Sequence, residues 1–545
     1  MIRSLKNKDN IISLLYILIL SALVITGSYF HEPWFDEAQA YLLARDASWH
    51  DIIFFWTHYE GHPPLWHMIL KCAVSLGLPY ELTLKGVNFI FFEAVLILIE
   101  FRSPFSRITK TIIPLSYFIL YQYSVTSRPY ILIMLAVLMT AMFYKERNNK
   151  PIRYCLSLMF LCALHSYGIA FAGGIVIADL LSETLRGHSI KKVAVRILRN
   201  KRLLVFYTLL LAFAVFLIID IMPRSDTSAS EKIKNSTNSY FLCLLLCFFL
   251  IPSETLITSY SSDIMMLQNE KNPLYENLTA GLFSLIIWSC IFVICRKRKM
   301  LPEMIIPYFF ISILASLYIN PHHFGIFLAY LLFILWTASD VQPVSLSDFS
   351  KITEKAGLSP KTAKKIAAGA AAVFAVINLY WDGYAYYTDI THQFDPGKSL
   401  AQWIKNENLT GKKILAEWDA GNTHMIFDCC ITSSPYFEEK QYYEPYDELT
   451  FISHIVPSES QSQAEIEMLA AKGKPDFIVC AKPYSAVRIC DELHIAEKYN
   501  AVAFTETSLK VFKSKAESME VYIMCTNETF RELYGRDYKG QIFEK

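Results

Sequence analysis

The sequence predicts a mainly α-helical protein that crosses a membrane many times and carries a small α/β domain at its C-terminal end. Hydrophobic residues make up 53% of the 545 positions and charged residues only 19%, compared with about 25% charged residues in an ordinary soluble domain. The apolar residues come in long blocks, and about 20 consecutive apolar residues cross the hydrocarbon core of a bilayer. The 37 Phe and 32 Tyr suit a protein with aromatic residues at both membrane interfaces.

Eleven segments are predicted to span the membrane. We interpret the first as an uncleaved span, because its apolar run is longer than the core of a signal peptide and no clear cleavage site follows it. Two of the segments, between residues 152 and 184, are short and could instead form one long span. The predicted spans are 11–30, 81–101, 111–127, 130–144, 152–165, 168–184, 203–222, 278–295, 302–319, 324–339 and 366–388.

Lysine and arginine indicate the orientation, because the loops that stay in the cytoplasm are enriched in both. The loops predicted to be cytoplasmic hold 26 of these residues, and the opposite loops up to the last span hold 7. If 152–184 were a single span, the block of seven basic residues at 183–202 would lie outside. Two short spans therefore fit better, and the sequence predicts a cell-membrane protein with a cytoplasmic N-terminus and an extracytoplasmic C-terminal domain.

Two of the outer loops are long and contain apolar stretches of their own. In loop 31–80, the stretches Asp51–His58 and Pro64–Leu78 are expected to form interfacial or re-entrant helices, because a further full span would break the charge pattern. In loop 223–277, the apolar block Tyr240–Pro252 is short for a span and is expected at the interface.

Beyond Asp389 the composition becomes that of a soluble segment. Helices are expected at Ser399–Asn406 and Ala464–Lys472, and strands at Lys413–Glu417 and Asp476–Ala481. Alternating helices and strands predict a small α/β domain over 391–545, after a transmembrane domain over 1–390. The sequence leaves open whether the five cysteines of this C-terminal domain form disulfides. These are Cys429, Cys430, Cys480, Cys490 and Cys525.

The first of five polar stretches on the predicted outer side holds two adjacent acids, Asp36 and Glu37, shortly after the first span. A charged side chain at the centre of a bilayer costs about 2.5–3.5 kcal/mol on insertion scales, so both acids are expected to face water, a cation or a substrate. An ionised Asp can act as a general base or as a metal ligand. The alternative is a pair of solvated acids at the start of an interfacial helix.

The second and third stretches supply histidines and an arginine. His58, His62 and His67 are four and five residues apart around a Pro-Pro turn and could hold a divalent metal, although turn and interface residues look the same. Arg128, followed by Tyr130, is the one basic residue of its turn. An arginine there suits a bidentate phosphate contact, and its alternatives are a lipid headgroup contact or a helix cap.

The fourth and fifth stretches carry His165 with Tyr167, and His322 with His323. A lone histidine at such a turn is more often a satisfied interface residue than a ligand. Taken together, however, the five stretches place carboxylates, histidines and an arginine on one side of the membrane. This combination of groups suits the transfer of a group from a phosphate-linked donor.

Several classes of function are disfavoured. The sequence has no P-loop, G-x-G-x-x-G, H-E-x-x-H or G-x-S-x-G motif. The short basic cytoplasmic loops leave no room for a nucleotide-binding domain, which argues against a cytosolic nucleotide-sugar donor and against ATP-driven transport. No nucleotide cofactor is expected. With a net charge of +1 and no basic patch interleaved with aromatic residues, no nucleic-acid partner is expected.

At these outer stretches the chain resembles the GT-C membrane glycosyltransferases. It looks most like the branch of the rhizobial lipopolysaccharide core transferases, with more distant similarity to lipid A aminoarabinose transferase and protein O-mannosyltransferases. The resemblance covers roughly residues 10–340. The matching segments are Trp34–Gln39, Glu60–Trp66, Ser127–Tyr130 and His322–Gly325.

The resemblance implies a GT-C-like catalytic domain that transfers a sugar, with inversion, from a polyprenyl-phosphate donor to a lipid, glycan or protein acceptor of the cell envelope. Asp36 would be the catalytic base or the ligand of an assisting divalent metal, with Glu37 beside it and His62 as a second candidate metal ligand. The metal could be Mg, Mn or Zn. Related proteins often carry Arg where this chain has Pro321, so His322 or His323 would replace that phosphate contact. The implied substrate-binding residues are His62, Arg128, Tyr130, His165, Tyr167, His322 and His323.

Two other function classes stay open. A transporter or flippase of lipid-linked sugars would need a polar path through the spans, and a non-catalytic receptor would bind its ligand through the C-terminal domain. The sugar, the acceptor, the oligomeric state and the role of the C-terminal domain are not fixed by the sequence.

Overall fold

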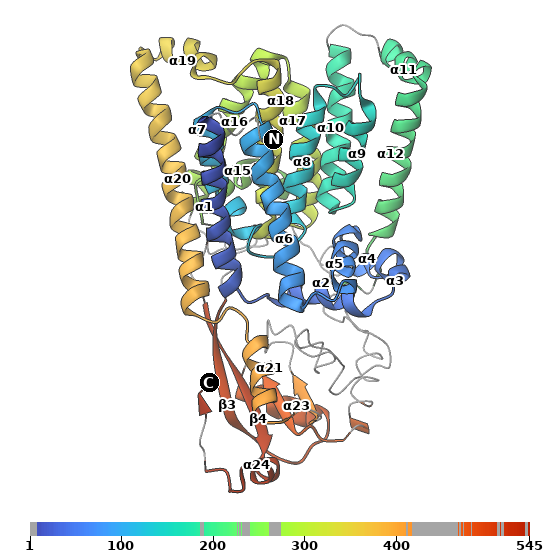
Figure 1. Ribbon diagram of the computed structural model, residues 1–545, viewed down its shortest axis with the longest axis vertical. Coiled ribbons are helices and arrows are strands. Elements are labelled where there is room, and N and C mark those ends of the chain that lie inside the picture. The colour runs from blue at the N-terminus through green and yellow to red at the C-terminus, as the bar shows by residue number, and fades with distance from the viewer. Residues whose placement is uncertain are drawn as a thin grey trace.

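The computed structural model describes residues 8–185, 190–225, 240–260, 274–409, 412–416, 473–480, 482–509, 517–539 and 543–544, together with the single positions 227, 230, 467, 470, 471 and 513. Within these residues the protein is mainly helical, with one five-stranded sheet near the C-terminal end. Figure 1 shows the long helices side by side in a bundle and the sheet beyond one end of that bundle. We call the end of the bundle next to the sheet the sheet end, and the opposite end the far end.

Seven stretches of the described chain are helical, long and apolar enough to cross a membrane, which supports a multi-pass membrane protein. They coincide with seven of the eleven predicted spans. Two of them include short non-α turns, the π-helical η2 (Leu98–Arg102) after α6 and the 3₁₀ turn η6 (Pro321–His323) before α18. The helices are α1 (Lys8–Phe30), α6 (Tyr80–Ile97), α10 (Ser166–Leu185), α12 (Lys201–Asp220), α16 (Leu274–Arg298), α18 (Gly325–Val341) and α20 (Pro360–Thr391).

Three further predicted spans are single helices of 12 to 17 residues: α8 (Tyr130–Tyr144), α9 (Pro151–Cys162) and α17 (Leu301–Leu317). At about 1.5 Å per residue, they are shorter than the hydrocarbon core, which is about 30 Å thick. The prediction that 152–184 forms two helices and not one is confirmed, because α9 ends at Cys162 and α10 begins at Ser166.

The prediction of one spanning helix over 111–127 is wrong. This part of the chain forms three short pieces, α7 (Arg107–Ile112), the 3₁₀ turn η3 (Ile113–Leu115) and the π-helical turn η4 (Phe118–Gln122). Pro114 lacks an N–H and interrupts the helical ladder, and Ser116 has extended backbone angles. The break leaves the N–H of Tyr117 to another partner, the side-chain oxygen of Asn378 on α20, at 3.0 Å.

The chain between α1 and α6 folds into four short helices at the sheet end of the bundle (Figure 1). They are α2 (Phe35–Asp46), α3 (Trp49–Phe54), α4 (Thr57–Glu60) and α5 (Leu65–Ser75). This agrees with the expectation of helices in loop 31–80. The apolar block that begins at Tyr240 also forms helices, α14 (Tyr240–Phe249) and α15 (Ile251–Leu256).

The far end of the bundle collects segments that the sequence predicts to be cytoplasmic. In Figure 1, α1, α12 and α20 begin there, and α7, α11 (Ile190–Arg199) and α19 (Ser350–Lys355) lie there. The connection to α19 includes the 3₁₀ turn η7 (Leu346–Phe349). The basic loops therefore share one end of the molecule, opposite to the sheet.

The sheet has the strand order β1-β2-β4-β3-β5 and is mixed. Strands β1 and β2 pair in parallel, as do β3 and β5, whereas β4 is antiparallel to both of its neighbours. The strands are β1 (Ile414–Ala416), β2 (Phe477–Cys480), β3 (Tyr499–Leu509), β4 (Glu517–Thr526) and β5 (Phe543–Glu544). The accompanying helices are α21 (Gly397–Asn406), α23 (Pro483–Glu492) and α24 (Asn527–Tyr534).

Helices cover both faces of this sheet. Phe477 packs against Trp403 of α21 on one face, and Ile478, the next residue of β2, packs against Ile489 of α23 on the other. This alternation is the period of two that a strand buried on both sides shows. The expected helix at 399–406 and the expected strands at 413–417 and 476–481 are confirmed, and most of the helix expected at 464–472 lies outside the described residues.

The cysteines of this C-terminal part that the structure describes are free and buried: Cys480, Cys490 and Cys525. Cys429 and Cys430 lie outside the described residues.

Helices α10 and α17 approach each other closely at a glycine. A Cβ atom on Gly174 would lie 2.5 Å from the Cα of Pro307, whereas a Cβ on Gly173 would have no atom within 4 Å. Small residues allow such close backbone packing between helices in membranes. The contact at Gly174 is therefore specific to that one position of α10.

We predict that Gly174→Ala destabilises the protein and that Gly173→Ala does not. Both changes favour the helix by about 1 kcal/mol, but only the first forces α17 outward, at a cost of about 1–3 kcal/mol for overpacking. Thermal unfolding of the detergent-solubilised variants measures the difference. Equal unfolding midpoints for the two variants would contradict the close contact.

Candidate functional site

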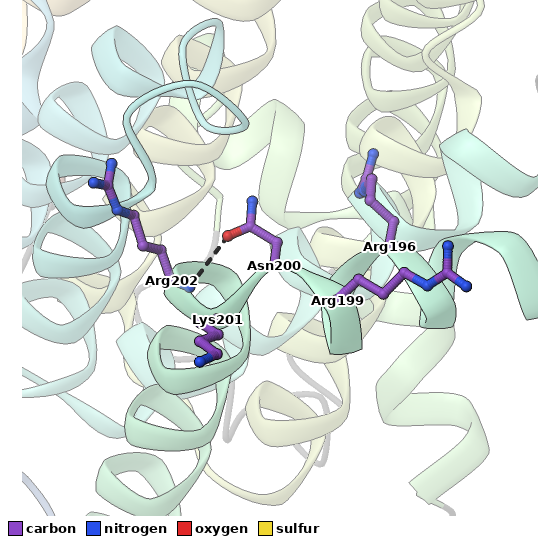
Figure 2. A pocket seen from close by; sticks show the side chains of 5 residues that line it. All are labelled: Arg196, Arg199, Asn200, Lys201 and Arg202. Atoms are coloured by element: carbon purple, nitrogen blue, oxygen red, sulfur yellow. Dashed lines mark hydrogen bonds between the residues drawn. The ribbon is translucent and has the colours of Figure 1, made fainter.

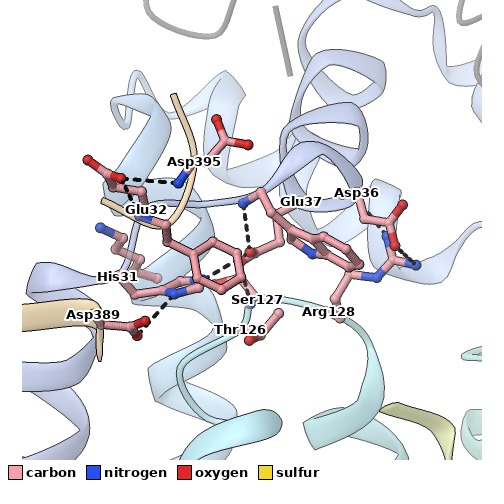
Figure 3. Close-up of polar contacts among 12 residues, drawn as sticks. His31, Glu32, Asp36, Glu37, Thr126, Ser127, Arg128, Asp389 and Asp395 are labelled. Atoms are coloured by element: carbon pink, nitrogen blue, oxygen red, sulfur yellow. Dashed lines mark hydrogen bonds and ion pairs between the residues drawn. The ribbon is translucent and has the colours of Figure 1, made fainter. Parts of the chain in front are cut away.

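At the sheet end of the bundle, Asp36 and Arg128 form an ion pair. Asp36 lies in the first turn of α2, and Arg128 lies in the turn that precedes α8. Nη2 of Arg128 is 3.3 Å from Oδ2 of Asp36, and Nη1 donates a hydrogen bond to the Asp36 carbonyl at 2.9 Å (Figure 3). Burial lowers the pKa of Arg128, but Asp36, Tyr130 and Glu60 together outweigh burial and raise the pKa above its ordinary value. The guanidinium is thus permanently charged.

Next to this pair lies a group of imidazoles that we call the histidine cluster: His62, His165, His322 and His323. Three of the rings meet around Tyr130 of α8, and the fourth, His62, contacts His165. The Tyr130 ring centroid lies 5.7 Å from that of His165, 5.7 Å from that of His322 and 5.6 Å from that of His323. The rings of His62 and His165 are 5.0 Å apart, and Tyr167 stacks on His165 at 5.1 Å.

Two members of the cluster lie in turns outside the candidate spans, and both are neutral at physiological pH. Burial, together with the smaller effect of the Arg128 charge, lowers the pKa of His165 to about 3. Burial also lowers the pKa of His62 well below its usual range, with His165 and Arg128 acting in the same direction. Neutral imidazoles in such a place can donate one hydrogen bond and accept another.

Local backbone structure fixes the cluster. Pro321 opens the η6 turn, in which the N–H of Asn320 donates to Nδ1 of His323 at 2.9 Å. The hydroxyl of Tyr123 donates to the His322 carbonyl at 2.9 Å. At the other turn, a Cβ on Gly168 would lie 2.1 Å from the Leu161 carbonyl oxygen, so only glycine fits beside His165.

A second network lies beside the ion pair and is centred on His31. This histidine is 1% exposed and lies between two carboxylates. Its Nε2 is 3.2 Å from Glu37 and its Nδ1 is 3.2 Å from Asp389, at the end of α20 (Figure 3). Burial alone lowers the pKa of His31, but Asp389 and then Glu37 outweigh it and raise the pKa to about 10. His31 is therefore a buried cation.

Glu37 is fully buried, and both of its carboxylate oxygens are engaged. Oε1 accepts a hydrogen bond from the backbone N–H of Ser127 at 2.6 Å. Oε2 accepts one from the N–H of Trp34 at 3.1 Å, in addition to its contact with His31. Glu37 thus fastens α2 to the residue next to Arg128. Its role as a catalytic carboxylate stays a prediction.

The C-terminal part contacts this region at two places. The Glu32 carboxylate accepts hydrogen bonds from the N–H groups of Phe394 and Asp395, at 3.0 and 3.2 Å (Figure 3). Burial raises the pKa of Glu32 to about 7 against the effect of these bonds. Elsewhere, the buried amine of Lys513 donates to the carbonyls of Glu254 and Thr255 on α15.

The second contact leads back to the histidine cluster. The hydroxyl of Thr255 donates to the carbonyl of Phe324 at 3.0 Å, and Phe324 directly follows His323. Lys513 is therefore connected, through α15, to the turn that carries two of the four clustered histidines.

Chain comparisons add nothing that would assign this site. No protein-family model matches the chain, and no curated protein matches it. The chemistry is therefore inferred from the residues themselves.

The structure brings all nine predicted site residues into one connected set of contacts at the sheet end. They are Asp36, Glu37, His62, Arg128, Tyr130, His165, Tyr167, His322 and His323. The sequence interpretation missed His31 and Asp389. His31 stands in the first polar stretch, but its partner Asp389 is 358 residues away, and nothing in the sequence pattern links two such positions.

The candidate metal ligands were Asp36 and His62, with His58 and His67 as the histidines that could hold a metal together with His62. In the part of the chain that the structure describes, no group of three or more His, Cys, Asp or Glu is arranged to hold a metal ion. The Nδ1 atom of His62 is buried and makes no hydrogen bond to a described residue, so this nitrogen is available to coordinate a metal ion. Metal binding by these residues stays a prediction.

We predict that His31→Gln destabilises the protein by about 3–5 kcal/mol, because it leaves two carboxylates buried without their cation. His50→Gln is the matched control, since His50 is largely exposed beside Asp51. The measurement is thermal unfolding of the purified full chain. Replacing His31, Glu37 and Asp389 together by Gln, Gln and Asn should recover part of the loss, because no unpaired charge then remains.

The contacts of His31 with Glu37 and Asp389 also predict that the stability of the protein depends on pH. The folded-state pKa of His31, about 10, lies above the ordinary value of 6.5, so its stabilisation is complete below pH 6.5 and is lost as the pH rises through 10. The wild-type protein should thus lose more stability between pH 7 and pH 10 than His31→Gln does. Parallel pH profiles for the two proteins would show that His31 is not a buried cation.

Proposed function

We propose that the chain is a GT-C-like membrane glycosyltransferase that moves a sugar, with inversion, from a polyprenyl-phosphate donor to a cell-envelope acceptor on the extracytoplasmic side. The observation that carries the proposal is the Asp36–Arg128 pair beside the histidine cluster, at the sheet end of the bundle. A carboxylate, a permanent cation and neutral hydrogen-bond donors are the groups that this reaction needs. The resemblance of the sequence segments around these residues points the same way.

In this proposal, Arg128 binds the donor phosphate. The pair is 3.3 Å long and a little exposed to solvent, so the phosphodiester monoanion of the donor can exchange for the carboxylate. A guanidinium makes bidentate contacts with phosphate oxygens. Neutral histidines of the cluster donate N–H groups to the remaining oxygens. Release of Asp36 from Arg128 then makes its carboxylate available only when the donor is bound.

The chemical step follows from that arrangement. The acceptor hydroxyl oxygen attacks the sugar C1 on the face opposite to the phosphate, the new C1–O bond forms, and the bond from C1 to the phosphate oxygen breaks. Asp36 takes the hydroxyl proton. The electron pair of the broken bond leaves on the polyprenyl phosphate, where Arg128 stabilises the growing charge. Attack from the opposite face inverts the configuration at C1.

Glu37 has a different part in this proposal. Because it is enclosed by His31, Ser127 and Trp34, it positions α2 and the Arg128 turn and does not touch the substrate. If a divalent metal binds at Asp36 and His62, it would lower the pKa of the acceptor hydroxyl. The residues named here would still bind the phosphate and orient the acceptor.

The proposal also includes a topology. The shorter helices α8, α9 and α17 and the broken segment 107–122 join the seven long helices as membrane-inserted segments, giving eleven crossings in all. The far end lies in the cytoplasm, which is supported by the gathering of basic segments there, and the α/β domain over 391–545 lies outside the cell. From there it can position the acceptor over the site, through the contacts at Glu32 and Lys513.

We predict that Asp36→Asn lowers sugar transfer by about 100-fold or more, the usual contribution of a general base. Asp46→Asn is the control, because Asp46 is on the same helix and pairs with its neighbour Arg45. The assay incubates the purified full chain with a panel of polyprenyl-phosphate sugars and measures product and donor hydrolysis. Both variants are first compared by thermal unfolding.

Full activity of Asp36→Asn would refute the role of Asp36. Movement of an intact lipid-linked sugar across reconstituted vesicles, with no product from any donor, would instead favour a transporter. Loss of all function on removal of 395–545, with Asp36 dispensable, would favour a receptor.

A further inference from the structure

A strongly basic hollow lies at the far end of the bundle, away from the candidate site. It is formed where α11 turns into α12, an elbow centred on Asn200 (Figure 2). Arg196 and Arg199 come from the end of α11, and Lys201 and Arg202 from the first turn of α12. The cavity has a volume of about 680 Å³ and is open to the surroundings.

Among the residues that the structure describes, three of the four cations have no neutralising partner. Arg196 is paired with Glu183 of α10 at 2.7 Å. In contrast, Arg199, Lys201 and Arg202 are exposed and form no ion pair with any residue that the structure describes. Within the described part of the chain, the elbow therefore carries three positive charges without an opposite charge beside them. Its backbone does not supply the anion site, because the Asn200 side chain already accepts from the N–H groups of Arg202 and Leu203.

An independent feature indicates what covers these cations. Along α12, Lys201, Val205 and Leu209 are spaced four residues apart and so share one face of the helix. Val205 is 56% exposed and Leu209 is 57% exposed. On α11, the apolar residue Leu198 is also exposed. Exposed cations thus lie directly above an exposed apolar stripe on a helix long enough to cross a membrane.

We propose that the α11–α12 elbow binds the phosphate headgroups of anionic glycerophospholipids in the leaflet at the far end, with the acyl chains along the apolar stripe of α12. Basic residues at a membrane surface attract anionic lipids in this way. In Figure 2, Arg199 and Arg202 extend to opposite sides of the elbow. This spread suits headgroups that exchange along a surface more than one small, tightly held anion.

The test compares binding of phosphatidylglycerol and phosphatidylcholine with identical acyl chains to the purified full chain, by native mass spectrometry. The test variant is Arg199→Gln/Lys201→Gln/Arg202→Gln. The matched control is Lys361→Gln/Lys364→Gln/Lys365→Gln, which removes three exposed lysines from the start of α20 at the same end. Thermal unfolding without added lipid verifies that both variants are folded.

The wild type and the control variant should bind phosphatidylglycerol at least about tenfold more tightly than phosphatidylcholine, and the test variant should lose this preference. Equal binding of the two lipids by the wild type would overturn the proposal. An equal loss in both triple variants would overturn it as well, because the effect would then be one of general charge. A third arm replaces the lipid by inorganic phosphate at matched ionic strength. Binding of inorganic phosphate as tight as that of phosphatidylglycerol would indicate a free-anion site and contradict the lipid assignment.

Discussion

The buried cation His31, held between Glu37 and Asp389, is the interaction on which the arrangement of the candidate site depends. It lies just after α1 and contacts the first turn of α2 and the last turn of α20. Three elements that are far apart in the sequence therefore meet at one charged group. Two carboxylates buried so completely would repel each other without this cation, and the geometry that brings Asp36 to Arg128 would lose its support.

The candidate site divides its histidines between two tasks. His31 is charged because two carboxylates flank it, whereas His62 and His165 are neutral because they are buried beside Arg128. The same side chain thus serves as a fixed cation in the supporting network and as a neutral donor or acceptor in the cluster. In the proposed function, this separation leaves Arg128 as the charged group that meets the donor phosphate, and Asp36 as its exchangeable partner.

Much of the fold follows from sequence periodicity and charge. Long apolar runs predict α1, α12 and α20 because composition alone decides whether a helix suits a bilayer. The stretch 111–127 is an exception, because its apolar composition does not produce one spanning helix. Its apolar composition suggests a span, but Pro114 and the extended Ser116 break it into short turns, and its freed backbone groups are satisfied by distant side chains such as Asn378. A hydrogen bond to such a distant side chain cannot be recognised from the local sequence.

In the candidate site too, some residues could be predicted from the local sequence and others could not. Asp36, Arg128 and the histidine pair 322–323 could be predicted because each stands as a polar group in an apolar context on the same side of the charge pattern. Asp389 could not be predicted, since its contact with His31 joins residues 358 positions apart. Lys513 was missed for a related reason, because a lysine in the C-terminal part of the sequence gives no sign that it reaches the carbonyls of α15.

The central claim is that the Asp36–Arg128 pair and the histidine cluster form the pocket for the donor phosphate. Photo-crosslinking tests it most directly, with a polyprenyl-phosphate sugar carrying a diazirine on the first isoprene unit and mapping of the labelled peptides by mass spectrometry. The account predicts labels in the segments around Asp36, Arg128 and His322, suppressed by excess unlabelled donor. Specific labelling only near the α11–α12 elbow, or within the middle of the spanning helices, would contradict it.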